Sequence, residues 1–177
     1  MELGARVHLL AAILLLAAGP AGARVLLSQK EALALAFPSG KVERRTAYLT
    51  DAELKEASAR GRVKVDSRVW HYYAGEEGYA YFETHVVRTM PETFMALVGK
   101  DGALKFVEVL AFAEPDDYLP RDRWLEQFQG RKLDGDLFVR RAIRNVTGSS
   151  LTAQALTDGA RRVLAVHSVI HKVESTK

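Results

Sequence analysis

Residues 145–153 combine hydroxyl side chains with a glycine, which is the composition of a turn that could bind phosphate. The chemistry-bearing residues are Thr147, Gly148, Ser149, Ser150 and Thr152. Apolar residues then recur at helical spacing, at Leu156, Ala160, Val163 and Leu164. Free N–H groups at a helix start, together with the helix dipole, attract phosphate. The same residue types also make an ordinary helix cap, so both roles are open for this turn.

This turn and the helix after it resemble the FMN-binding domain family. The resemblance rests on Thr147–Ala153, on Thr157-Asp158 and on Arg161–Ala165, and it extends more loosely over residues 79–170. The family includes the flavin subunits of the sodium-pumping NADH:quinone reductase and of the Rnf complex. Its motif reads Asp-x-x-Ser/Thr-Gly-Ala-Thr, and a flavin transferase esterifies the FMN phosphate onto the final threonine.

The motif can be laid onto this chain residue by residue. Thr147 and Gly148 match its Ser/Thr-Gly, and Ser149 stands where alanine is usual. Ser150 stands where the flavin-bearing threonine is usual and keeps the hydroxyl, whereas Arg144 replaces the usual Asp. The resemblance therefore implies FMN as cofactor and Ser150 as its attachment point. The cofactor-binding residues that it implies are Thr147, Gly148, Ser149, Ser150, Leu151 and Thr152.

The function that the resemblance implies is electron transfer by an exported flavoprotein. Its partners would be a flavin transferase and membrane-bound or periplasmic redox proteins, and the domain would act as an electron carrier rather than as a stand-alone enzyme. Two alternatives stay open. One is a flavin-dependent reductase with its own substrate, although the sequence has no nicotinamide-binding fingerprint. The other is a binding or structural module that has the fold without the flavin.

A flavin ring needs flat apolar cover in addition to a phosphate site. Candidates for this cover are Tyr118, Leu119, Trp124 and Leu151, each of which could instead pack in the core or in a loop. The resemblance implies that the ring lies between the hydroxyl turn and the sheet.

Two other groups of polar residues could do chemistry. Arg88 is expected to form an ion pair with Glu92, or else to hold a phosphate or a partner's carboxylate. His167 and His171 lie four positions apart, a spacing that can hold a metal on one face of a helix. Because no glutamate completes a zinc-protease pattern, no metal site is expected.

The beginning of the chain has the pattern of a signal peptide. Arg6 precedes an apolar stretch, Leu9–Ala18, which is short for a membrane span. Gly19-Pro20 ends this stretch, and Ala21-Gly22-Ala23 reads as a cleavage site. We therefore expect an exported, periplasmic protein, with the outer face of the inner membrane as a further location. An uncleaved N-terminal anchor is the alternative.

Cleavage at this site gives a direct prediction. N-terminal sequencing or mass analysis of the exported protein should find Arg24 as its first residue. A mature protein that keeps Met1 would indicate an anchor instead.

Composition limits the remaining possibilities. The chain has 177 residues, of which 48% are hydrophobic and 27% charged, so one globular domain can follow the leader. It has no cysteine, which excludes disulfides, c-type haem attachment and iron–sulfur ligation by cysteine. The net charge is only +3, and the basic residues are dispersed except for Arg140-Arg141 with Arg144 and for Arg161-Arg162, so no nucleic-acid partner is expected.

The elements that must position the hydroxyl turn begin with short helices. Ser28 and Thr50 each start a capping box, in which a glutamate follows the hydroxyl residue by three positions. The first helix should run to Phe37. The second should end near Gly61, which stands where a terminal glycine belongs. A third short helix is expected over Arg121–Phe128.

Strands are expected between the second and third helices, because β-branched and aromatic residues cluster there. They should span Val63–Tyr73, Tyr79–Val87, Thr93–Val98 and Leu104–Leu110. Pro91 should interrupt the series, and Asp101-Gly102 favours a tight turn. The expected fold is therefore α+β, an antiparallel β-meander packed with helices, as in the FMN-binding domain family. The expected divisions are residues 1–23 as signal peptide, 24–62 as an N-terminal extension of helix and strand, and 63–177 as the FMN-binding domain.

Overall fold

The computed structural model describes residues 23–146 and 148–172. Thr147 and all of the expected signal peptide except Ala23 lie outside this range. The described residues form an antiparallel sheet of six strands in the order β1-β6-β5-β4-β3-β2. The strands are β1 (Arg24–Val25), β2 (Val42–Tyr48), β3 (Val69–Gly75), β4 (Tyr79–Val87), β5 (Met90–Val98) and β6 (Leu104–Phe112). The α-helices are α1 (Gln29–Ala36), α2 (Asp51–Gly61), α3 (Asp122–Leu125) and α4 (Ser150–Ile170).

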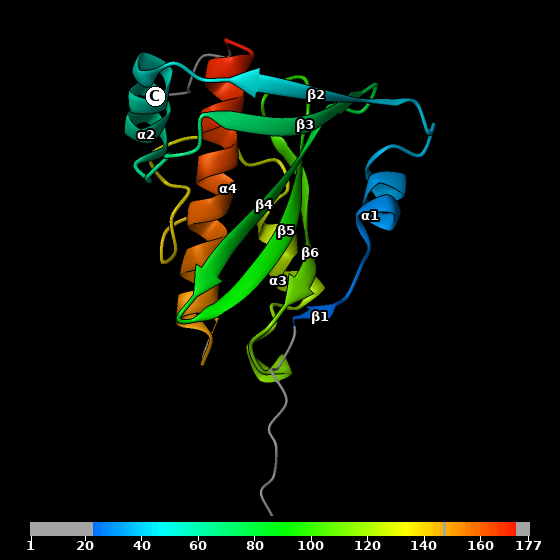
Figure 1. The fold of residues 1–177 in the computed structure, drawn as a ribbon. Coiled ribbons are helices and arrows are strands. Elements are labelled where there is room, and N and C mark those ends of the chain that lie inside the picture. The colour runs from blue at the N-terminus through cyan, green and yellow to red at the C-terminus, as the bar shows by residue number, and fades with distance from the viewer. Residues whose placement is uncertain (1–22, 147, 173–177) are drawn as a thin grey trace, which may run out of the picture.

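The long helix α4 packs along one face of the sheet (Figure 1). The sheet presents Tyr81, Phe94 and Val107 to this interface, and all three are buried in the main core. The four apolar helix positions expected from the sequence to form the inner face are also buried in this core: Leu156, Ala160, Val163 and Leu164. The α+β meander expected from the sequence is thereby confirmed, and burial of these side chains is its main source of stability.

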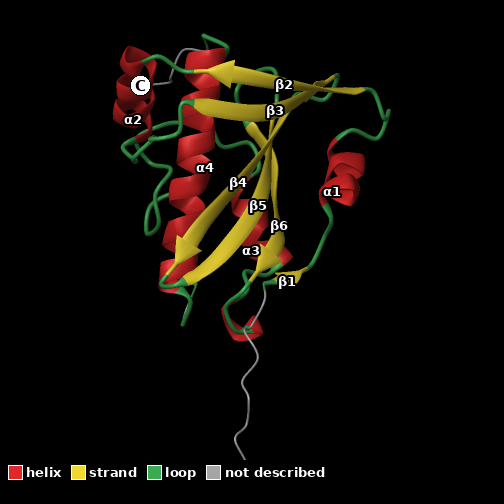
Figure 2. Ribbon diagram, in the orientation of Figure 1, coloured by secondary structure: helices red, strands yellow, loops and turns green. Residues whose placement is uncertain are grey.

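Helix α1 covers the opposite face of the sheet with a smaller core. Ala32, Ala36 and Phe37 pack there against β-strand residues that include Met95 and Leu97. Figure 2 shows α1 and α4 on opposite sides of the strands. Helices α1 and α2 both begin with the capping boxes expected from the sequence.

The N-terminal extension was expected to contain strand as well as helix, but the positions of its two edge strands were not expected from the sequence. β2 pairs with β3 over its whole length, and β1 pairs with the end of β6. β2 reads Val-Glu-Arg-Arg-Thr-Ala-Tyr, and nearly all of it is exposed, so it carries no clear apolar alternation. Residues 24–62 therefore complete both edges of the sheet that residues 63–112 build.

Two expectations for the region around Gly61 differ from the structure. The strand expected from Val63 begins only at Val69. Gly61 is the last residue of α2 rather than a left-handed cap, and Arg62 takes the left-handed conformation instead, with φ of 48°. A Cβ at Gly61 would lie 3.0 Å from the Cβ of Ala165, so the glycine lets α2 approach α4 closely.

Pro91 does not interrupt the sheet. It is the second residue of β5 and lies opposite Val86 of β4. The pairing of β5 with β6 begins only at Glu92, so the N–H that proline lacks removes no hydrogen bond on the β6 side.

Arg161 is a buried clamp between α4 and its neighbours, although its side chain is charged. Its Nε donates to the carbonyl of Gly61 at 2.8 Å, and its Nη1 donates to the carbonyls of Leu137 and Asp134 at 2.7 and 3.1 Å. The guanidinium lies 3.7 Å from the ring centroid of Phe138. One side chain therefore holds the end of α2 and the loop before α4 against this helix.

Replacing Arg161 with methionine should destabilise the fold strongly. Methionine fills similar space but leaves three carbonyl groups without a donor, and each buried group of this kind costs about 1–3 kcal/mol. Urea denaturation should show the free energy of unfolding reduced by about 3 kcal/mol or more. The matched control is Lys30→Met, at an exposed position of α1. Its free energy of unfolding should stay within about 0.5 kcal/mol of the wild-type value. Equal midpoints for both variants would contradict the clamp.

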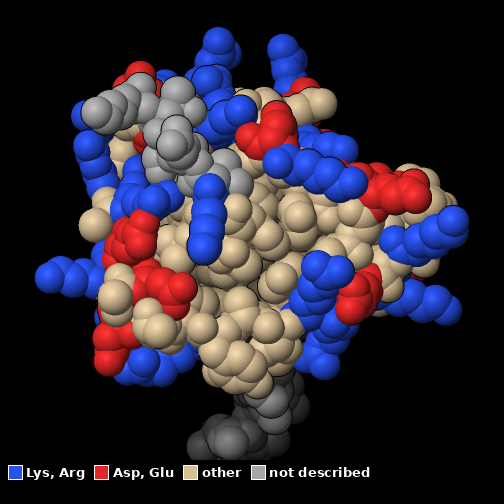
Figure 3. Space-filling model, turned by 90° about the horizontal axis from the view of Figure 1, so that it is seen from above, with Lys and Arg blue, Asp and Glu red and all other residues tan. Residues whose placement is uncertain are grey.

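The described surface is mixed in charge. At the end formed by β2, β3 and the last turns of α4, Lys and Arg side chains alternate with Asp and Glu around an uncharged centre (Figure 3). Among the described residues, no helix is both long and apolar enough to cross a membrane.

Candidate functional site

The hydroxyl turn leads directly into α4, and its side chains divide between solvent and interior. Gly148 has φ of 86°, a conformation that favours glycine, and a Cβ there would meet open space. Ser150 and Leu151 are exposed, whereas Ser149 and Thr152 are 2% and 1% exposed. Ser150 is therefore the accessible serine of the motif.

The start of α4 lacks the side-chain cap that α1 and α2 have. Ser149 is the N-cap residue, but its hydroxyl accepts no backbone N–H bond. Its Oγ is buried and has no hydrogen-bond partner in the described part of the chain. Ser149 thus does not cap the first-turn N–H groups, and these N–H groups are the ones that attract anions at a helix start.

Asn145 positions the hydroxyl of Ser150. Its Nδ2 donates to Ser150 Oγ at 2.8 Å, which leaves the serine hydrogen free for another acceptor. The Oδ1 of Asn145 is buried and finds no partner among the described residues. Two unpartnered polar atoms, on Asn145 and Ser149, therefore flank the exposed Ser150.

A cavity of about 830 Å³ opens beside Asn145. Its volume is within the range of small-molecule sites. Five arginines line it: Arg121, Arg123, Arg131, Arg141 and Arg144. Leu119 and Trp124 supply apolar surface, and Trp124 Nε1 donates to the carbonyl of Arg144 at 2.7 Å. The cavity thus combines a strongly basic wall with an indole that is held in place.

The structure brings together only part of the ring cover expected from the sequence. Leu119 and Trp124 line the cavity. Tyr118 lies beneath Arg88, 5.0 Å from its guanidinium, and Leu151 is 52% exposed. The lining arginines were not expected. The short spacing of Arg141 and Arg144 was a visible signal, but Arg121 reaches the cavity from a distant loop.

A second polar group lies beneath the N-terminal half of α4. The expected Arg88–Glu92 pair is wrong, because Arg88 Nη1 bonds Glu114 Oε1 at 2.9 Å instead. Glu92 is 1% exposed, and its Oε2 lies 2.9 Å from His85 Nε2. The hydroxyl of Thr152 donates to Glu114 Oε2 at 3.4 Å, so this residue faces the interior. The register of β4 and β5 explains why Glu92 pairs with His85 and not with Arg88, since His85 lies directly opposite Glu92.

Burial shifts the pKa values of the carboxyl groups in this region. Burial raises the pKa of Glu83 to about 7, although the charges of Arg162 and His85 oppose the shift. Burial also raises the pKa of Glu92, and the charge of Glu114 acts in the same direction. Perturbed carboxyl groups of this kind are frequent at functional sites.

His167 and His171 surround the hydroxyl of Tyr81. The Tyr81 oxygen lies 2.9 Å from His167 Nδ1 and 3.2 Å from His171 Nε2. Burial, followed by the neighbouring His171, lowers the pKa of His167 to about 3, so this histidine is neutral at physiological pH. Among the described residues, no group of three or more His, Cys, Asp or Glu side chains could hold a metal ion.

The fold and the site together define an α+β domain with an arginine-lined cavity that reaches Asn145 and Val146, in the segment before α4. In comparisons with known proteins, no family model, no curated protein and no solved structure matches the chain. The likeness to FMN-binding domains therefore depends on the motif residues alone.

Proposed function

We propose that this protein is an exported FMN-binding flavoprotein that transfers electrons, with FMN attached to Ser150 through a phosphodiester. The observation that supports the proposal most is the arginine-lined cavity, which opens beside the Asn145–Ser150 hydrogen bond. An anionic, partly flat molecule of FMN's size suits such a cavity in charge, shape and volume.

The residues around the cavity fit the parts of FMN. The arginine side chains and the first-turn N–H groups of α4 would hold the phosphate. Trp124 and Leu119 would cover the ring, because both line the cavity. FMN supplies the redox chemistry when it is bound, and the protein orients it and tunes its surroundings.

Exposure favours Ser150 over Ser149 as the attachment point. A transferase must reach the hydroxyl that it modifies, and Ser150 is exposed whereas Ser149 is buried. Asn145 holds the Ser150 oxygen from one side and leaves its other side free. Thr152 would contribute indirectly in this arrangement, because its hydroxyl is bonded to Glu114.

The partners and location in this proposal follow from the resemblance. A flavin transferase would attach the cofactor, and membrane-bound or periplasmic redox proteins would exchange electrons with it. The protein would act in the periplasm, with the outer face of the inner membrane as a further location.

Titration of flavin-free protein with FMN and with riboflavin tests whether the arginines of the cavity bind the phosphate, because riboflavin lacks the phosphate. The double variant Arg121→Gln/Arg144→Gln should weaken FMN binding at least about tenfold, since a charged hydrogen bond contributes about 1.5–3 kcal/mol. Riboflavin binding should change little. Quenching of flavin fluorescence measures both affinities, and Arg44→Gln on β2 is the exposed control.

Equal losses for FMN and riboflavin would contradict a phosphate role for these arginines. Rapid turnover with NADH and an electron acceptor would favour the reductase alternative. If neither flavin bound, the protein would be a module that has the fold without the cofactor.

A further inference from the structure

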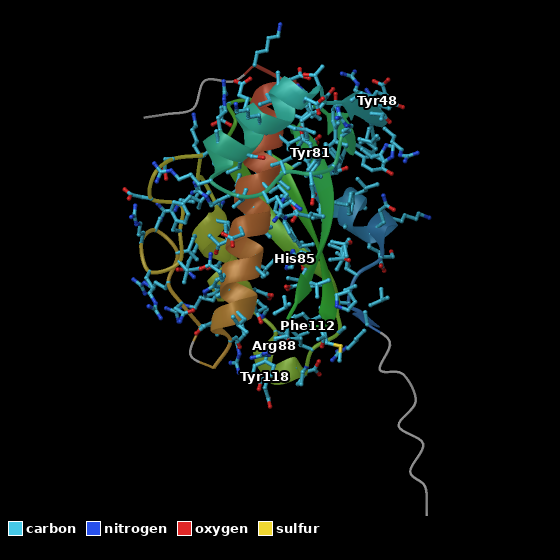
Figure 4. The ribbon with its side chains drawn as sticks, turned by 60° about the vertical axis from the view of Figure 1, so that its left-hand side comes forward. Tyr48, Tyr81, His85, Arg88, Phe112 and Tyr118 are labelled. Atoms are coloured by element: carbon cyan, nitrogen blue, oxygen red, sulfur yellow. The ribbon has the colours of Figure 1, made fainter. Side chains whose placement is uncertain are left out.

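The sheet is open between β3 and β4. These two strands pair only over Tyr72–Ala74 of β3, although β4 continues to Val87. Figure 1 shows β3 crossing one end of the sheet while β4 runs diagonally away from it. In Figure 4, β4 descends from Tyr81 past His85, away from Tyr48 on the edge strand β2. Beyond Tyr81, no strand of the described chain pairs with β4 on the side that faces β3.

The open side of β4 leaves backbone hydrogen-bonding groups without a partner strand. Gly75 N donates to Gly78 O at 3.0 Å, so the residues at even positions of β4 direct their N–H and C=O groups toward the β3 side. Thr84 and Thr93 agree with this alternation. Their hydroxyls lie 2.8 Å apart, as the close side chains of a non-hydrogen-bonded β4–β5 pair allow. The N–H and C=O groups of Thr84 and Val86 therefore point into the opening, and such an edge is a template for a further strand.

A hollow of about 600 Å³ lies in this opening. Residues 69–71 of β3 line one side of it, and residues 82–84 of β4 line the other. Apolar side chains are exposed on the same face of the sheet. Val69 is 43% exposed and Val86 is 63% exposed, and Tyr48, which lies opposite Val69 on β2, is 77% exposed. Apolar side chains at alternate positions of a docked strand would cover this surface.

The charged groups of the hollow favour an acidic partner. Its charged lining residues are Arg44 and Glu83. Glu83 is 7% exposed and forms an ion pair with Arg162, so its charge is compensated. The guanidinium of Arg44, in contrast, has no hydrogen-bond or ion-pair partner among the described residues. A carboxylate of a bound partner would therefore complement Arg44.

We propose that the opening between β3 and β4 binds an extended segment of a partner protein, which adds to the free edge of β4. The segment forms hydrogen bonds with the backbone of Thr84 and Val86. Its apolar side chains cover Val69 and Val86, and one of its carboxylates reaches Arg44. Main-chain bonds of this kind give affinity, whereas the contacts of alternate side chains give specificity. The exposed side chains lie on the sheet face opposite α4, so this interaction goes beyond flavin binding and does not depend on it.

Fluorescence anisotropy with a labelled peptide tests the site. The probe is the capped heptapeptide Thr-Val-Thr-Glu-Thr-Val-Thr, in which two valines and one glutamate share one face of the extended chain. It should bind the purified mature protein saturably. Amide hydrogen exchange, followed by NMR, should show that the peptide protects the N–H groups of Thr84 and Val86. The N–H groups of Glu83 and His85 point to β5 and should change little.

Two substitutions of Thr84 separate the role of the backbone from that of the side chain. Thr84→Pro removes the N–H that points into the opening and leaves the β4–β5 hydrogen bonds in place. The affinity for the peptide should therefore fall at least about tenfold. Thr84→Val loses the same hydroxyl but keeps the N–H, so it should bind the peptide as the wild type does. Equal peptide affinities of the two variants would overturn strand addition.

A charge exchange at Arg44 tests the same site without changing the backbone. Arg44→Glu should weaken binding of the glutamate peptide at least about tenfold, because it places like charges together. The same variant should prefer a peptide that has lysine in place of the glutamate. The matched control is Arg45→Glu, whose side chain lies on the other face of β2. This control should bind the glutamate peptide with wild-type affinity.

Three results would overturn the proposal. The first is the absence of saturable peptide binding to the wild type. The second is a loss of binding in Arg44→Glu that the lysine peptide does not reverse. The third is a dimer of the free protein in light scattering, with the N–H groups of Thr84 and Val86 protected before peptide is added, because a second copy of this chain would then be the occupant. Each of these results leaves the flavin proposal unaffected.

Discussion

Replacing Ser150 with alanine should abolish covalent attachment of FMN. The side-chain oxygen of Ser150 is exposed and is held by Asn145 at 2.8 Å, and alanine removes the only atom at that position that can form the ester. A denaturing gel of wild-type protein, made with its transferase and export machinery, should show a fluorescent band. The Ser150→Ala protein should show none.

Two matched variants control for this result. Ser150→Thr keeps the hydroxyl and should stay labelled. Ser149→Ala should also stay labelled, because the Ser149 hydroxyl is buried and makes no hydrogen bond within the described residues. Loss of the band from Ser149→Ala, with Ser150→Ala still fluorescent, would show that the attachment point is Ser149 instead.

The second large expected effect is a loss of folding stability at low pH, caused by the buried His167. The pKa of His167 falls from 6.5 to about 3 in the folded protein, because burial penalises its charged form. Its contribution to stability is therefore fully present above pH 6.5 and is lost as the pH falls towards 3. The shift corresponds to a loss on the order of 5 kcal/mol across this window.

Comparison with His167→Gln isolates this contribution. Glutamine cannot titrate but can still accept a hydrogen bond from the Tyr81 hydroxyl. Glu83 acts in the opposite direction, since its pKa rises from 4.5 to about 7 and its contribution is lost as the pH increases through that range. Both proteins contain Glu83, so its effect cancels in the difference. Urea denaturation at several pH values should show the advantage of the wild type over the variant shrinking below pH 6.5. Parallel curves would contradict a buried neutral His167.

The central fold could be predicted because its residues follow clear periodicities. Tyr79–Val87 matches β4 at both ends, and the inner face of α4 was expected from residues such as Leu156 and Val163. β2 could not be predicted, because an exposed edge strand with charged side chains has no apolar alternation. Its place in the sheet comes from pairing with β3, and this pairing is a long-range property.

The site was predictable only where its residues lie close together in sequence. The start of α4 was expected from the hydroxyl turn, and the structure begins the helix at Ser150. The cavity joins Arg121 to Arg144, and a buried carboxyl group joins Glu114 to Arg88, through contacts that only the folded chain creates. The role of Arg161 could not be predicted for the same reason, because its three carbonyl partners come from segments distant in sequence.

The most direct test of the central claim is the intact mass of the mature protein purified from its own host. The proposal predicts a mass that exceeds the polypeptide by one FMN joined through a phosphodiester, and a flavin absorbance that survives denaturation. Flavin that is released on denaturation would support the cavity but contradict attachment at Ser150. A colourless protein with the mass of the bare polypeptide, which also fails to bind added FMN, would contradict the claim altogether.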